Sequence, residues 1–206
     1  MILKNKNQGF IQYYCLRTKK NAGFTLTEIV SVIGLFLLVA LITFGVFNIS
    51  QRSFTIGDRH LEISQNGRIF LDRLTRELRQ TQEIVTPLPA TKNVVGFPPA
   101  NEIEFQNGHD ADDIRYLRYY LDGNLIKHQS IVYFFADEPN NYVYWNTQDE
   151  FGVFPTKSVL EEKTIAEYIN QLWFYGSNIT YIEAWLTKAT ASLHLYTGIW
   201  GRNNRL

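Results

Sequence analysis

The chain has 206 residues and a formal net charge of zero, with 20 basic and 20 acidic side chains. Hydrophobic residues make up 45% of it, which excludes a disordered chain, and 13 Gly and 6 Pro exclude a collagen-like one. The single Cys excludes an internal disulfide framework and a multi-Cys zinc site, and zero net charge argues against a dedicated nucleic-acid binder.

The first predicted element is a basic segment, residues 1–23, which carries five Lys or Arg residues and no acid. Residues 24–206 therefore have a net charge of −5. The only Cys, Cys15, also lies in the basic segment, so a chain without that segment has no thiol and no thiol catalysis.

A charge-free apolar run of 19 residues, 29–47, comes next and would form a helix about 28 Å long. Because it is apolar on every face and follows a cationic segment, it predicts a transmembrane helix with a cytoplasmic N-terminus rather than a buried core helix. A secretory signal peptide is the alternative, but its apolar run is shorter and is followed by a small-residue cleavage site, which 48–52 does not contain.

One acid, Glu28, stands at the start of the apolar run. A carboxylate inside lipid costs about 2.5–3.5 kcal/mol, so Glu28 needs a partner, protonation or a place near the headgroups. The residues around it form a pattern: a basic leader ends in Gly23, followed by Phe24, Thr25, Leu26, Thr27, Glu28 and the apolar helix. This pattern resembles the leader of type IV pilins and type II secretion pseudopilins.

The resemblance implies cleavage by prepilin peptidase between Gly23 and Phe24 and N-methylation of Phe24. Glu28 would serve assembly by pairing with the positive N-terminus of a neighbouring subunit. The implied partners are other minor pilins or pseudopilins and the major subunit, through the N-terminal helix, together with the inner-membrane assembly platform. The implied location is the inner membrane, single-pass, with the head extracytoplasmic and at the filament tip after assembly; no cofactor, metal or catalytic residue is implied.

The helical pattern continues as an apolar stripe with a mixed-charge face, so the prediction is one helix over 24–84, on the order of 90 Å long. The whole chain is then expected to consist of a cleaved leader (1–23), a transmembrane helix (24–47), an amphipathic stalk helix (48–84) and a β-rich head (85–206). Major pilins commonly have Pro at the position of Gly45, which leaves a helix break there open.

Residues 65–80 resemble the minor pilin W and pseudopilin J subfamily. The amino-acid sequence of this segment is more similar to minor pilin W, whereas the length of the chain after cleavage is closer to that of pseudopilin J. The choice between a type II secretion system and a type IV pilus or competence system therefore stays open.

Short aromatic and β-branched runs after residue 87 predict strands. The Asp122-Gly123 pair predicts a hairpin turn between 114–121 and 124–135. A short helix or strand approach is expected at 164–170, and further strands at 101–106, 142–145, 171–175, 180–186 and 192–200. The expected fold class is α+β: a long N-terminal helix packed on a mostly antiparallel β-sheet head.

The head has no hydrolase, metalloprotease, phosphate-loop or redox motif, so we expect no enzyme. The acidic loop 109–113 is a weak calcium candidate, and the net charge of −5 over 85–206 argues against nucleic-acid binding. One alternative is a membrane-anchored enzyme with an all-β head, which requires His128 or His194 grouped with Asp and Ser. The other is an extracytoplasmic binding module, for example for carbohydrate, which requires Trp residues exposed in a row.

Overall fold

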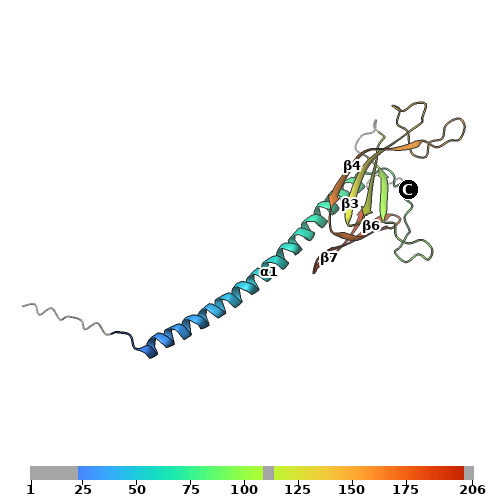
Figure 1. Ribbon diagram of the computed structural model, residues 1–206. Coiled ribbons are helices and arrows are strands. Elements are labelled where there is room, and N and C mark those ends of the chain that lie inside the picture. The colour runs from blue at the N-terminus through green and yellow to red at the C-terminus, as the bar shows by residue number, and fades with distance from the viewer. Residues whose placement is uncertain (1–22, 109–113, 202–206) are drawn as a thin grey trace, which may run out of the picture. The chain divides into compact units, whose positions relative to one another are not determined.

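The computed structural model describes residues 23–108 and 114–201, in which one helix, α1, is followed by seven strands, β1 to β7 (Figure 1). The basic leader up to residue 22 and the acidic loop 109–113, the weak calcium candidate, lie outside the described residues. The chain separates into two compact units, the first ending at Ile49 and the second beginning at Ser50.

Helix α1 spans Leu26–Gln80 without interruption at Gly45. It ends four residues before the predicted bound of 84. The reason lies in the next residue, Thr81, whose buried hydroxyl donates toward the carbonyl oxygens of Gln106 (2.8 Å) and Glu83 (3.0 Å). The chain after α1 thus takes its hydrogen bonds from β1 instead of continuing the helix.

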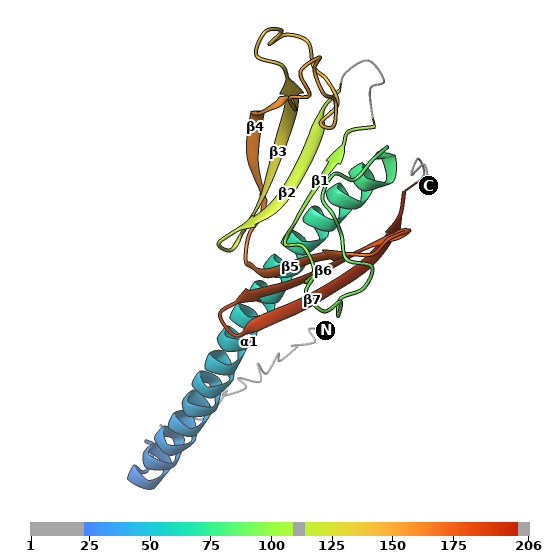
Figure 2. The same cartoon turned by 90° about the vertical axis from the view of Figure 1, so that its right-hand side faces the viewer.

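The first sheet has four antiparallel strands in the order β1-β2-β3-β4 (Figure 2). Their bounds are Glu102–Gln106, Tyr116–Asp122, Leu125–Phe134 and Thr156–Ala166. The β2–β3 hairpin is confirmed, and its turn consists of Gly123 and Asn124, with Gly123 at φ +60°.

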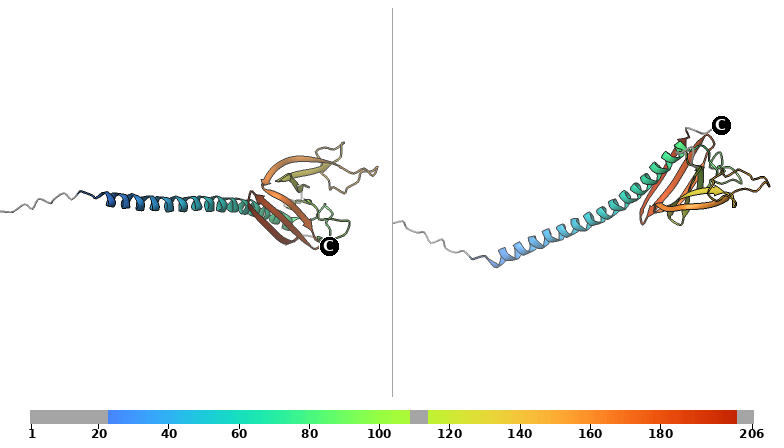
Figure 3. Two further views of the ribbon diagram at one scale, coloured as in Figure 1. Left: turned by 60° about the horizontal axis from the view of Figure 1, so that its bottom comes forward. Right: turned by 90° about the horizontal axis from the view of Figure 1, so that it is seen from above.

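The second sheet has three antiparallel strands in the order β5-β6-β7, with bounds Ile169–Tyr175, Ile179–Lys188 and Ala191–Trp200 (Figures 2 and 3). The α+β class and the antiparallel strands are therefore confirmed, but the strands form two sheets where one was expected.

One hydrophobic core joins both sheets to the second half of α1. The helix contributes its stripe at i, i+4 and i+7 spacing, and each sheet contributes one face. The helical members of this core are Ile63, Phe70, Leu74 and Leu78. Gly67 lies on the same stripe and is buried, so the helix backbone comes close to β6 and β7 there: a Cβ on Gly67 would lie 2.4 Å from Leu195 Cδ1.

One strand prediction is wrong: residues 142–145 are not a strand, and Tyr142 makes one isolated bridge to Phe134. Of the two structures expected at 164–170, the strand is confirmed, since these residues include the end of β4 and the start of β5. Strand β4 itself was missed over most of its length, because it is an edge strand with both faces mainly exposed and so has no apolar–polar alternation.

Candidate functional site

The predicted cleavage and modification residues, Gly23 and Phe24, lie immediately before α1. Both are exposed, and a Cβ on Gly23 would meet nothing within 4 Å. No neighbouring group in the described chain covers this peptide bond. Phe24 lies two residues before the first residue of α1, so the bond is outside regular helix.

Thr25 caps the helix that follows. Its hydroxyl accepts a hydrogen bond from the backbone N–H of Glu28 (3.3 Å), and its carbonyl accepts from the N–H of Glu28 and of Ile29. The sequence Thr-x-x-Glu at this position is a capping-box pattern, which the sequence reasoning missed although the spacing was visible. Glu28 thus lies in the first turn of α1, where a negative charge also interacts favourably with the helix dipole.

The helix from Leu26 to Ile49 is exposed on all its faces. Within the part of the chain that the structure describes, α1 is the one helix long and apolar enough to cross a membrane, and none of its apolar window is buried. Leu35, Leu41 and Phe44, which point in different directions around the helix, are 66%, 72% and 67% exposed. A surface of this size and composition needs lipid or other helices around it.

In the second unit, a mostly buried carboxylate connects α1 to the first sheet. Glu77 on α1 accepts hydrogen bonds from Tyr119 Oη on β2 (2.6 Å) and from Arg73 Nε one turn earlier (3.0 Å). His128 Nε2 on β3 lies 3.7 Å from the same carboxylate and has no hydrogen-bond partner among the described residues. Tyr119 and His128 face each other across the β2–β3 pair, with ring centroids 4.8 Å apart.

These contacts determine the electrostatics of the junction. Burial raises the pKa of Glu77, but the nearby His128 imidazole and the hydrogen bonds from Tyr119 and Arg73 outweigh burial and hold the pKa below its usual value. Burial, and then the charge of Glu77, raise the pKa of Tyr119 far above its usual range. Glu77 is therefore ionised and Tyr119 neutral across the physiological pH range, so this group anchors the helix rather than exchanging protons.

A second buried carboxylate, Glu183 on β6, lies on the face of the second sheet opposite the core. Lys92 Nζ contacts both of its oxygens (3.0 and 2.9 Å), and His194 Nε2 lies 3.0 Å from Oε1. Lys92 also lies over the rings of Trp173 and Trp185, at 4.6 and 5.1 Å from their centroids. This network is internally paired and holds segment 81–101 on the sheet.

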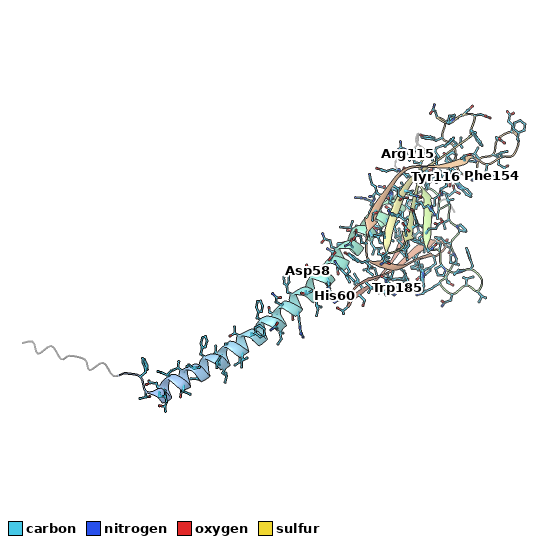
Figure 4. All side chains as sticks on the ribbon, viewed as in Figure 1. Asp58, His60, Arg115, Tyr116, Phe154 and Trp185 are labelled. Carbon is cyan, nitrogen blue, oxygen red and sulfur yellow. The ribbon has the colours of Figure 1, made fainter. Side chains whose placement is uncertain are left out.

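The histidines are placed apart. His60 is exposed on α1, as Figure 4 shows, whereas His128 is buried and His194 belongs to the Glu183 network. Within the described ranges neither His128 nor His194 has a Ser or Asp as a hydrogen-bond partner, which is the grouping that the enzyme alternative requires. No group of three or more His, Cys, Asp or Glu that could hold a metal occurs among the residues described.

The four Trp residues do not form an exposed row. Trp145, Trp173 and Trp185 are half-buried, and Trp200 at the end of β7 is exposed. Trp173 and Trp185 pack edge to face, with centroids 4.6 Å apart, and Trp185, a residue of β6, is labelled in Figure 4. The binding-module alternative required Trp residues exposed in a row, and the described Trp residues do not meet that requirement.

Comparisons of the chain with protein-family models, with curated proteins and with solved structures gave no match.

Proposed function

We propose that the chain is a minor pilin or pseudopilin: a non-enzymatic subunit that primes or caps a type IV pilus or type II secretion pseudopilus. In this proposal prepilin peptidase removes residues 1–23 on the cytoplasmic side, and Phe24 becomes the N-methylated first residue. Helix α1 then anchors the subunit in the inner membrane and packs against the helices of neighbouring subunits.

One combined observation carries the proposal. The basic leader, Gly23, Phe24 and Glu28 directly precede a helix that is apolar and exposed on every face as far as Ile49. Each Leu, Ile, Val or Phe that moves from water into lipid or into a helix bundle contributes about 1.5–3 kcal/mol. A single chain offers this segment no cover, so a membrane and then a bundle of subunits are the environments it suits.

The leader supports the orientation. Its five basic residues lie on the N-terminal side of the apolar segment, and Lys and Arg of that kind stay on the cytoplasmic side. The β-rich part of the chain then lies on the other side of the membrane, where it carries no Cys.

In this proposal Glu28 has two roles, one as a charge and one in helix capping, and substitutions can separate them. As a charge it pairs with the ammonium group of a neighbour's Phe24, whereas as the acidic residue of the Thr-x-x-Glu capping pattern it only supports the first turn of its own helix. Gln retains the capping function but not the charge.

The first test is the intact mass of the membrane-extracted protein from cells that contain a prepilin peptidase. Loss of residues 1–23 with the mass of one added methyl group is the expected result. An uncut chain, or a cut after residue 47, contradicts the proposal. Replacement of Gly23 by a bulky residue should block the cut, while Gly34→Ala, a glycine inside the apolar helix with open space around it, should not.

The second test compares Glu28→Gln, Glu28→Val and Thr25→Ala in a piliation or secretion assay. If Glu28 pairs by charge, both Glu28 variants are cleaved but assemble poorly, and Thr25→Ala assembles normally. Normal assembly of Glu28→Gln together with failure of Thr25→Ala would leave Glu28 with a capping role alone.

A further inference from the structure

A polar pocket of about 470 Å³ lies in the second unit, where the chain leaving α1 passes the turn between β5 and β6. Its walls come from residues of segment 82–88, from the turn 176–178 and from Trp200 at the end of β7. We call it the Trp200 pocket. It shares no residue with the N-terminal segment on which the proposed function rests, so its role is a separate question.

Trp200 is unusual among the four Trp residues because 66% of it is exposed. It pairs in register with Ile179, and at the next position on that face, Gly198, the side chains of Ile179 and Tyr181 occupy the space that a Cβ would need. The indole lines the pocket and is mostly exposed. A large exposed aromatic ring beside a cavity is a common feature of a binding surface.

Four of the five polar side chains that line the pocket have no hydrogen-bond partner among the described residues, whereas the fifth, Thr86, accepts a hydrogen bond at Oγ1 from the backbone N–H of Glu104 (2.8 Å). Gln82, Glu83, Ser177 and Asn178 line it, and none of their side chains makes a hydrogen bond or an ion pair with another residue in the described part of the chain. They supply amide donors, a hydroxyl and several acceptor oxygens. The pocket thus combines unpaired hydrogen-bonding groups with one aromatic platform.

The backbone holds the pocket walls in place before any ligand arrives. The N–H of Gly176 donates to the carbonyl of Pro89 (2.7 Å), and Ala100 and Phe174 exchange two backbone hydrogen bonds (3.0 and 2.8 Å). These bonds fasten the segment after α1 to strand β5. At Gly176 itself φ is +120°, and a Cβ would lie 1.8 Å from the carbonyl oxygen of Ile179, so the turn requires glycine.

The charge of the pocket disfavours anionic ligands. Glu83 is the one ionisable side chain among the described lining residues, and Lys, Arg and His are absent from them. A lone carboxylate repels phosphate, sulfate and nucleic acid but accepts hydrogen bonds from neutral hydroxyl groups. A sugar ring presents hydroxyl groups at its edge and an apolar C–H face that packs on an indole.

From this combination we infer that the Trp200 pocket binds a neutral saccharide. The C–H face of the sugar packs on the Trp200 ring, and its hydroxyl groups bond to Glu83, Gln82 and Asn178. The volume of the pocket is at the lower end of the range of small-molecule sites and suits the end of a glycan chain rather than a long polymer segment.

The test uses the full chain with ¹⁵N-labelled Trp in a detergent that contains no sugar. The probes are maltotetraose, cellotetraose and chitotetraose, each titrated to about 10 mM, at the weak limit of measurable affinity. The expected result is a saturable shift of the Trp200 indole N–H signal by one of them, with the signals of Trp145 and Trp173 unchanged. Trp200→Phe assigns the signal.

Variants make the result specific. Trp200→Ala and Glu83→Gln should each weaken binding about tenfold or more. The control, Trp145→Phe, changes a half-buried Trp that does not line the pocket and should bind normally. No shift with any tetrasaccharide overturns the inference, as does a Trp200 shift with inorganic phosphate or with a Ser-Gly tetrapeptide instead. Because cleavage and assembly are read from other residues, either conclusion can fail without the other.

Discussion

Replacing Tyr119 by Phe removes a single hydroxyl group from the junction between α1 and the first sheet. That hydroxyl donates to Glu77 at 2.6 Å, and Tyr119 itself is completely buried. The Phe ring retains the contacts with Phe70 and Phe105, whose centroids lie 6.3 and 6.2 Å away. The substitution therefore probes one hydrogen bond to a mostly buried carboxylate.

A hydrogen bond to a charged group contributes about 1.5–3 kcal/mol, and we expect the free energy of unfolding to fall by that amount. For a unit of this size, such a loss lowers the Tm by about 3–12 °C. The assay is guanidinium unfolding of the micelle-bound chain, followed by Trp fluorescence. All four Trp residues lie beyond residue 115, so the signal reports on the β-rich part.

The neighbouring residue provides a matched control. Tyr120 points to the opposite face of β2, and its hydroxyl donates to Glu162 at 2.9 Å in an exposed pair. Exposed pairs contribute about 1 kcal/mol or less, so Tyr120→Phe should have a small effect. Equal losses in Tyr119→Phe and Tyr120→Phe would refute the argument that the Glu77 junction holds the helix on the sheet.

The remaining predictions concern pH and the helix glycines. Because the pKa of Glu77 is lowered on folding, its contribution is complete above the ordinary carboxyl value near 4.5 and is lost as pH falls through the lower folded value. The destabilisation by Tyr119→Phe should therefore shrink when unfolding is repeated across that acid window; a difference independent of pH would contradict this. Gly57→Ala should stabilise α1 by about 0.5–1 kcal/mol, because a Cβ there meets nothing, whereas Gly67→Ala should lose that gain to the contact with Leu195. Thermal unfolding of the two Ala variants beside the parent chain measures both effects, and an equal gain at both positions would show that the Gly67 contact costs nothing.

Secondary structure that depends on local pattern was predictable. The charge-free run and the apolar stripe that follows it predicted the helix, and the Asp122-Gly123 pair predicted the β2–β3 hairpin, with its turn one residue before the observed Gly123-Asn124 turn. Both signals act within a few residues, through helical periodicity and through a backbone angle that glycine adopts readily.

Strand β4 is an element that the local sequence pattern does not predict. Its sequence, TKSVLEEKTIA, places charges on both faces, and it becomes a strand because β3 offers hydrogen-bonding partners from Ile126 to Phe134. An edge strand of this kind is typical of a sheet margin that avoids further pairing. Strand β3 lies more than 20 residues earlier in the chain, so the local sequence around β4 does not include its pairing partner.

The functional groups divide in the same way. The sequence by itself determined the leader pattern at Gly23, Phe24 and Glu28 and the apolar helix, since these are contiguous and their chemistry is read in order. Only the tertiary structure placed Glu77 beside Tyr119 and His128, and Trp200 beside the segment that follows α1. Those residues are tens of positions apart or more, and the register of two sheets, which depends on the packing of the whole core, decides which of them meet.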